Sequence, residues 1–117
     1  MTSQNLYMHG SKLGEITASG EVWIGGVKVG DITTEGEIWV EGEKEGEITT
    51  DGEVWKAGNK IGDITTDGEI WREGEQIGSI EENGDVWLNG SHVGNVKGGN
   101  VRNAAAVLFF GFYNLAS

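Results

Sequence analysis

The chain has 117 residues, of which 21 are glycine and none is cysteine or proline, and its formal net charge is −11. This length allows a single domain, expected to span residues 1–117, and the lack of cysteine excludes disulfides and thiolate chemistry. The acidic charge makes nucleic acid and anionic membranes unfavourable partners, because like charges repel.

The first segment, residues 5–13, has the pattern of half a repeat. Leu6-Tyr7-Met8-His9-Gly10 matches a Val-Trp-x-x-Gly pattern that recurs later in the chain, with tyrosine in place of tryptophan. Residues 1–12 contain no apolar run of the kind that forms a signal peptide. A cytoplasmic location is therefore the default expectation, although the sequence leaves the location unknown.

Residues 14–102 repeat one pattern of sixteen residues, Gly-x-Ile-x-x-x-Gly-x-(Val/Ile)-Trp-x-x-Gly-x-x-x. A short fixed period indicates one small structural unit that is copied along the chain. Each full unit carries one tryptophan, at the same place in the pattern: Trp23, Trp39, Trp55, Trp71 and Trp87.

Each unit contains two turn signals. Ala57-Gly58 separates two short β-prone runs by two residues, which predicts a tight hairpin turn with positive φ at both central positions. Thr66-Asp67-Gly68 predicts a type I turn followed by a glycine bulge. Both turns reverse the chain, so each unit is expected to form a pair of antiparallel strands.

A third glycine column, represented by Gly62, falls inside a predicted strand. Ile61 and Ile64 flank this glycine at a separation of three residues, so strict alternation would place them on opposite faces. A bulge at Gly62 would turn both inward. Alternatively, the glycine leaves space for a tryptophan ring from the neighbouring strand, and the two interpretations are compatible.

The ends of the repeat array indicate how the sheet terminates. An open meander would leave exposed edge strands, which natural proteins avoid. The leading half-repeat can pair with a trailing half made of Gly94-Asn95-Val96 and Val101, after a shortened turn at residues 97–100. Pairing of the two halves would close the sheet into a ring.

The last segment, residues 103–117, is free of acids and holds an apolar run at residues 104–113 that is too short to span a bilayer as a helix, which takes about 20 residues. It is expected to be a helix or strand buried in the ring, because an uncovered apolar run would aggregate. The alternative is an exposed arm that binds a sister chain, giving a homo-oligomer or filament. The candidate plug or assembly residues are Val107, Leu108, Phe109, Phe110, Phe112 and Tyr113.

These patterns resemble bacterial β-flower proteins of the four-fold and five-fold kinds. The resemblance is carried by the hairpin pattern of residues 62–70 and by the aromatic tail of residues 104–112. It implies an all-β fold in which tandem 16-residue hairpins are arranged as petals around a central axis, in a closed ring with the apolar C-terminal tail packed at the centre. This chain departs from the pattern in having five complete units and two halves, and in its regular tryptophans. The resemblance implies no established activity or ligand.

The tryptophans and Tyr7 are the candidate functional aromatics, with two interpretations. They either pack in the core or between petals, or they form platforms on which a glycan or another ligand stacks. Acidic turns such as Asp51-Gly52-Glu53 lack the spacing of a calcium loop and are explained by turn propensity. His9 and His92 have no partner motif and are expected at the surface.

The sequence contains no nucleophile elbow and no Ser-His-Asp arrangement, so catalysis is not expected. It also contains no pattern for a cofactor or a metal. The predicted function is a non-catalytic structural or interaction module, and self-assembly is one form that this role can take. The alternative is a module that binds glycans or other ligands through its repeated tryptophans.

Overall fold

The computed structural model describes residues 4–98 and 101–113, which form twelve strands and one helix. The bounds are β1 (Gln4–Met8), β2 (Ser11–Ile16), β3 (Glu21–Ile24), β4 (Val27–Ile32), β5 (Glu37–Val40), β6 (Glu43–Ile48), β7 (Glu53–Lys56), β8 (Asn59–Ile64), β9 (Glu69–Arg72), β10 (Glu75–Ile80), β11 (Asp85–Leu88), β12 (Ser91–Lys97) and α1 (Val101–Phe109).

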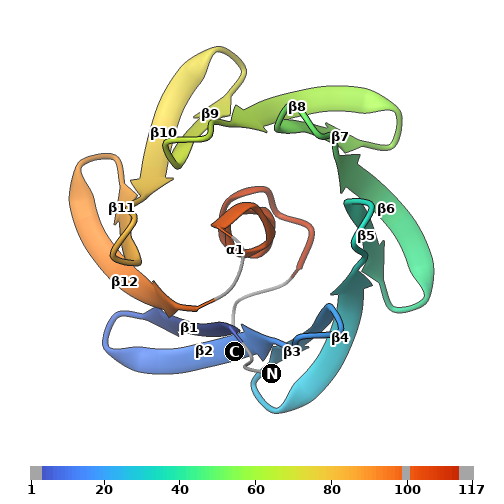
Figure 1. Cartoon of the computed structure of the whole chain (residues 1–117), viewed down its shortest axis with the longest axis horizontal. Coiled ribbons are helices and arrows are strands. Elements are labelled where there is room, and N and C mark those ends of the chain that lie inside the picture. Colours follow the sequence, from blue (N-terminus) through green and yellow to red (C-terminus); the bar gives the residue numbers. More distant parts are fainter. Residues whose placement is uncertain (1–3, 99–100, 114–117) are drawn as a thin grey trace.

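The strands form one closed antiparallel barrel in which sequence neighbours pair and β12 pairs with β1. Figure 1 shows tight hairpins arranged around an axis on which α1 is seen end-on. We call each hairpin a petal, from the first (β1–β2) to the sixth (β11–β12) among the described residues, and each junction between consecutive petals a boundary. The predicted all-β ring of petals is confirmed.

The tip of each petal is the predicted two-residue turn. At Ala57-Gly58 the φ angles are 52° and 84°, and four other non-glycine residues in the described ranges occupy the same left-handed position: His9, Glu41, Glu73 and Asn89. Two consecutive positive φ angles give a turn whose twist matches that of the flanking strands. The half-repeat at the N-terminus follows this rule too, so it forms a full petal.

Consecutive petals are linked by the predicted three-residue turn. The amide of Gly68 donates to the carbonyl of Thr65 at 3.0 Å, and Gly68 has a φ of 89°. The Thr65 hydroxyl accepts a hydrogen bond from the amide of Glu69 at 3.0 Å. The hydroxyl therefore closes the turn from the side chain, which explains why threonine precedes this turn in most units.

The bulge predicted at the third glycine column is present. Val54 pairs with Gly62 and Trp55 pairs with Lys60, which leaves Ile61 without a partner in the register. Ile64 is buried and Ile61 packs against the core in a partly buried position.

The other interpretation, that Gly62 leaves space for a neighbouring tryptophan ring, is wrong about which ring fills the space. The atoms nearest to a Cβ added at Gly62 belong to the backbone carbonyl of Trp71 and to the ring of Phe110. The indole of Trp71 is not among them, because the strand turns this side chain away from the core. The tail supplies the aromatic ring instead.

The ring closes where the chain ends meet. Leu6 lies opposite Val96, and the Gln4 side chain donates from Nε2 to the carbonyl of Gly98 at 2.8 Å. The predicted pairing of the two half-repeats is therefore confirmed for β1 and β12. Val101, expected at a strand position, instead begins α1. The shortened turn predicted at residues 97–100 extends outside the described residues.

The core lies between the strands and the tail. Each strand contributes one buried aliphatic side chain. The tail contributes Ala104, Ala105, Ala106, Val107, Phe109, Phe110, Phe112 and Tyr113. The tail is a helix rather than a strand in its first part, and it begins at Val101, ahead of the boundary expected at residue 103. It lies inside its own ring, so the plug is confirmed and the exposed assembly arm is wrong.

Four tail aromatics sit against four consecutive glycines of the third column. Counted along the tail, the pairs are Phe109 with Gly78, Phe110 with Gly62, Phe112 with Gly46 and Tyr113 with Gly30. The tail thus passes the petals in reverse order. Each glycine leaves a volume that one aromatic ring of the tail fills. The tail is not itself a repeat, yet it packs against the same position in four successive petals.

Candidate functional site

The repeated tryptophans lie on the outward-facing side of the strands, which we call the outer wall. In β7 the side chain of Val54 is buried in the core, and alternation along the strand directs Trp55 to the opposite face. All five tryptophans are partly buried, and none belongs to the core or to the partly buried residues packed against it. The structure therefore places these aromatics at the surface of the ring.

Four of the five indoles are held by a carboxylate two residues earlier. Trp55 Nε1 donates to Glu53 Oε1 at 3.3 Å, and the other oxygen of Glu53 lies 3.4 Å from Lys60 Nζ. Lys60 also contacts Asp63 at 3.1 Å. The same indole-to-carboxylate bond is present at Trp23, Trp39 and Trp71. A fixed ring is thus presented with a carboxylate at its edge.

Across the boundary, four of the five tryptophans face an acidic residue of the preceding petal. Glu47 lies directly opposite Trp55 in the register of β6 and β7, and it is paired with Lys44 at 3.2 Å. The hydrogen bond that Lys44 donates to Glu47 raises the pKa of Lys44 above its usual value. A pocket of about 300 Å³ opens here, lined by Lys44, Glu47, Trp55 and the petal tip at Gly58.

The boundary between the first two petals has the same form. Trp23 lies opposite Glu15, which is paired with Lys12 at 3.0 Å, and a pocket of about 470 Å³ is lined by these residues and by the tip at Gly25. Small-molecule sites begin at about 300 Å³. The pocket at Trp55 has this minimum volume and the pocket at Trp23 is larger. The same kind of pocket thus occurs at two boundaries of the ring.

Within residues 4–98, four boundaries join a tryptophan to an opposite ion pair. The pairs are Lys12–Glu15, Lys28–Asp31, Lys44–Glu47 and Lys60–Asp63, which face Trp23, Trp39, Trp55 and Trp71 respectively. The remaining boundaries differ. Trp87 lies opposite Ser79, and Tyr7 lies opposite Asn95, so neither faces a charged residue.

In the sixth petal, a histidine contacts both the acidic residue and the tryptophan of the hairpin. His92 Nε2 lies 3.3 Å from Asp85 Oδ1, and its ring meets that of Trp87 edge to face at a centroid distance of 5.4 Å. Trp87 Nε1 is buried and has no hydrogen-bond partner among the described residues. Asp85 stands where the second to fifth petals have glutamate, and its shorter side chain explains the missing bond.

The contact of His92 with Asp85 is a pair that the sequence interpretation missed. His92 is exposed, as expected, but it has a partner across the hairpin. The signal was present: Lys60 and Glu53 stand at the same places in an earlier unit. Because the bulge sets the register, residues seven positions apart meet on one face.

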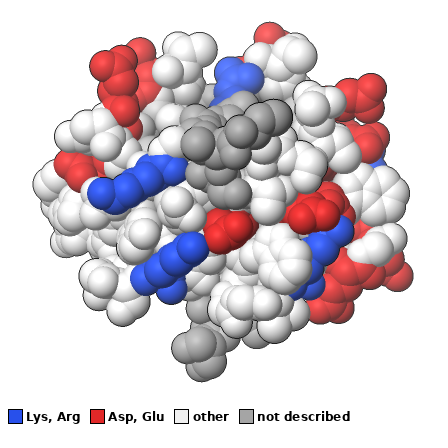
Figure 2. Space-filling model, turned by 60° about the horizontal axis from the view of Figure 1, so that its bottom comes forward, with Lys and Arg blue, Asp and Glu red and all other residues white. Residues whose placement is uncertain are grey.

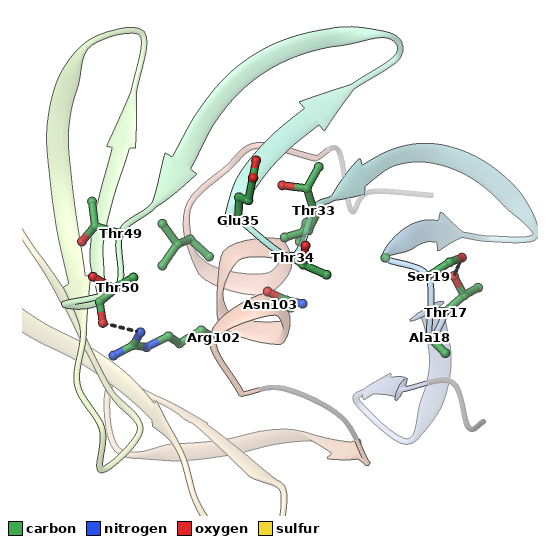
Figure 3. A pocket seen from close by; sticks show the side chains of 14 residues that line it. Thr17, Ala18, Ser19, Thr33, Thr34, Glu35, Thr49, Thr50, Arg102 and Asn103 are labelled. Carbon is green, nitrogen blue, oxygen red and sulfur yellow. Dashed lines mark hydrogen bonds between the residues drawn. The ribbon is translucent and has the colours of Figure 1, made fainter.

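A third pocket, of about 340 Å³, lies where the three-residue turns surround the start of α1. Figure 3 shows Arg102 and Asn103 projecting from the helix, with Arg102 Nη1 donating to the carbonyl of Thr50 at 3.0 Å. The hydroxyls of Thr33 and Thr49 accept bonds from backbone amides of their own turns. These hydrogen bonds hold the turns and the helix in place.

The tail residues proposed as plug or assembly contacts are inside the ring. Val107, Phe109, Phe110, Phe112 and Tyr113 are buried, and Leu108 is partly buried. Burial raises the pKa of the Tyr113 phenol above its usual value, with a smaller contribution from the charge of Asp31. Its hydroxyl donates to the carbonyl of Trp39 at 2.8 Å. These groups are thus part of the core.

Basic side chains from the petals cover the aromatic tail. Arg72 donates from Nη1 to the carbonyl of Phe109 at 3.3 Å, at the end of α1, and its guanidinium lies 5.8 Å from the centroid of the Phe110 ring. Lys56 Nζ lies 5.3 Å from the centroid of Phe112. The two cations satisfy a helix terminus and two aromatic faces, which is a packing role.

Charges are interspersed on the surface that Figure 2 displays, with wide uncharged areas between them. Among the described residues, no group of three or more His, Cys, Asp or Glu side chains could hold a metal ion, and no helix is both long and apolar enough to cross a membrane.

Comparisons with protein-family models, with curated proteins and with solved structures give no match for this chain.

Proposed function

We propose that the protein is a non-catalytic interaction module whose outer wall presents several copies of one aromatic site. The observation that carries this proposal is the position of the tryptophans. They lie outside the core and are partly exposed, and Trp23 and Trp55 line pockets between a petal tip and an ion pair of the preceding petal.

The composition of the core supports a role for these side chains beyond folding. Aliphatic columns and tail aromatics fill the inside of the ring without any tryptophan. Large aromatic rings that are half-exposed beside polar groups are typical of binding surfaces, because they supply contact area with little loss of side-chain entropy.

The ring arrangement also favours binding of an extended or repetitive partner. Once one site is occupied, a linked second ligand group binds at a high effective concentration, so weak sites combine into strong attachment. A ring with equivalent boundaries presents such sites at a regular spacing.

We also propose membership of the β-flower proteins, supported by the petals and by the aromatic tail at the centre.

Binding to surfaces coated at high density tests the proposal. The surfaces are a neutral polysaccharide, an anionic one, a cationic one and an unstructured peptide, and the readout is retention of the protein at equilibrium. The wild type is compared with the variant Trp39→Leu/Trp55→Leu, and thermal unfolding verifies that the variant is folded. We expect retention on at least one surface and a loss of ten-fold or more in the variant, because sites acting together multiply their contributions.

The matched control is Thr66→Ala, an exposed turn position away from the outer-wall tryptophans. It is expected to bind as the wild type does. Retention of the wild type on no surface, or equal retention of a folded double variant, would contradict the proposed function.

A further inference from the structure

We infer that the four boundaries where a tryptophan faces an ion pair are binding sites for neutral saccharides. This inference rests on the proposed function and names the ligand class of the same sites. The sites are those of Trp23, Trp39, Trp55 and Trp71 within residues 4–98. The boundaries at Trp87 and Tyr7 are not included.

The first argument concerns the polar wall of the pocket. Lys44 is paired with Glu47 beside Trp55, and Glu45 also lines the pocket, so the wall offers ammonium donors and carboxylate acceptors together. A sugar hydroxyl both donates and accepts, and it can bond to both members of the pair. Hydrogen bonds to charged groups are stronger than those between neutral groups.

The second argument concerns charged ligands, which this wall disfavours. An anionic ligand that approaches Lys44 also meets Glu47 and Glu45, and a cationic ligand that approaches Glu47 meets Lys44. Either ligand must compete with a short ion pair that is already formed. A neutral ligand leaves this pair in place, so the pairing of charges selects for neutral polyols over charged sugars.

The third argument concerns the aromatic face. An indole face carries negative partial charge and attracts the weakly positive C–H groups on the flat side of a pyranose ring. Glu53 holds the indole of Trp55 through Nε1 at 3.3 Å, so the platform is oriented before a ligand arrives. Binding to an oriented platform loses less conformational entropy.

The chain contains its own control. Trp87 is at the same place in its petal but faces Ser79, and the residue at the place of the lysine is Gln76. If the ion pair is the specific feature of the site, Trp87 does not bind, and building a pair at this boundary creates a new site.

The test follows each indole N–H separately by two-dimensional NMR of the full-length protein, with peaks assigned from single Trp→Phe variants. The probes are the neutral trisaccharides cellotriose and N,N′,N″-triacetylchitotriose, the cationic trimer of glucosamine and the anionic trimer of galacturonate. We expect the four indole peaks to shift in a saturable way with the neutral probes, at least ten-fold more tightly than with the charged probes, while the Trp87 peak stays in place.

Two sets of variants locate the determinant. Glu47→Val is expected to abolish the shift of Trp55 and to leave that of Trp23, whereas the matched change Ser79→Val alters no shift. The variant Gln76→Lys/Ser79→Asp is expected to make the Trp87 peak shift as the other four do. Unchanged peaks of the untouched petals show that each variant is folded.

The outcomes separate the two proposals. Shifts only with the charged probes, or equal shifts at Trp87, would overturn the inference while the outer-wall tryptophans remain a binding surface. If no probe shifts any indole, the inference fails, and the surface-binding comparison then decides on the proposed function independently.

Discussion

The ring of Phe110 occupies the space that Gly62 leaves open: a Cβ atom added to Gly62 would lie 2.6 Å from Cε1 of Phe110. The backbone of Gly62 is not in the left-handed region, so its conformation does not require glycine. The residue serves tertiary packing instead. This relationship connects the repeat to the tail, and it is repeated at three further petals.

The variant Gly62→Ala is expected to lower the free energy of unfolding by about 1–3 kcal/mol or more, because the added methyl group collides with Phe110 and with a backbone carbonyl. Phe110→Ala alone is expected to lower it by about 3–5 kcal/mol. The double variant should lose less than the sum, since removing the ring relieves one collision. Urea unfolding measures all three values.

Gly14→Ala is the control for this cycle. The atoms nearest to a Cβ at Gly14 are backbone atoms of Trp23 and Ile24, and no tail ring is among them. It is expected to be destabilising but additive with Phe110→Ala. Strict additivity for Gly62 as well would show that the glycine and the ring do not interact.

Tyr113 is expected to make the fold sensitive to alkali. Its phenol has a pKa raised above the usual value of 10.0, mainly by burial. The unfolded chain therefore releases this proton at a lower pH than the folded chain does. The resulting stability is fully present below about pH 10 and is lost as the pH rises above it.

Tyr113→Phe tests this expectation. It removes the hydrogen bond to the carbonyl of Trp39 and should lower stability near neutral pH by about 1 kcal/mol. Above about pH 10 the variant should lose less stability with pH than the wild type. Lysines also titrate there, but they do so in both proteins. Parallel pH profiles of thermal unfolding would speak against a buried phenol.

Asp85→Glu is expected to stabilise the protein by about 1 kcal/mol. The longer side chain can reach Trp87 Nε1, which is buried and lacks a partner among the described residues, in the way that Glu53 reaches Trp55. The reverse change Glu53→Asp should destabilise by a similar amount. Thermal unfolding of the two variants gives the comparison, and a destabilised Asp85→Glu would refute the explanation.

Truncation after Gly98 is expected to abolish cooperative unfolding. The deletion removes Val107, Phe110 and other buried tail residues from the inside of the ring, so an apolar cavity would be left open to water. The readouts are near-ultraviolet circular dichroism of the tryptophans and the scattering of light by aggregates. A soluble monomer with a native spectrum would mean that the petals close without a plug.

Most of the fold could be predicted because it depends on local signals. Ala57-Gly58 and Thr66-Asp67-Gly68 each specify a turn through the backbone conformation of a few residues. The sixteen-residue period then requires every unit to repeat the same pair of turns, and the half-repeats imply that the ends meet. The bulge beside Gly62 followed from the same reasoning, through the spacing of Ile61 and Ile64.

The candidate site could be predicted only in part. The sequence identified the tryptophans, but their location on the outer wall depends on which face of each strand the tail covers. The pairing of Glu47 with Trp55 and of His92 with Asp85 depends on the register across a boundary and across a bulged hairpin. Neither register is visible in one unit read alone.

The sequence by itself determined the repeated hairpin, its turns and its closure, because these follow from backbone geometry within a few residues. Only the tertiary structure decided that Phe110 meets Gly62, that the tail passes the petals in reverse order, and that an ion pair stands opposite four of the tryptophans in residues 4–98. The physical reason is that packing joins residues far apart in sequence. Because the petals repeat one sequence pattern, that pattern does not specify which petal each tail residue contacts. The path of the single tail through the centre of the ring decides it.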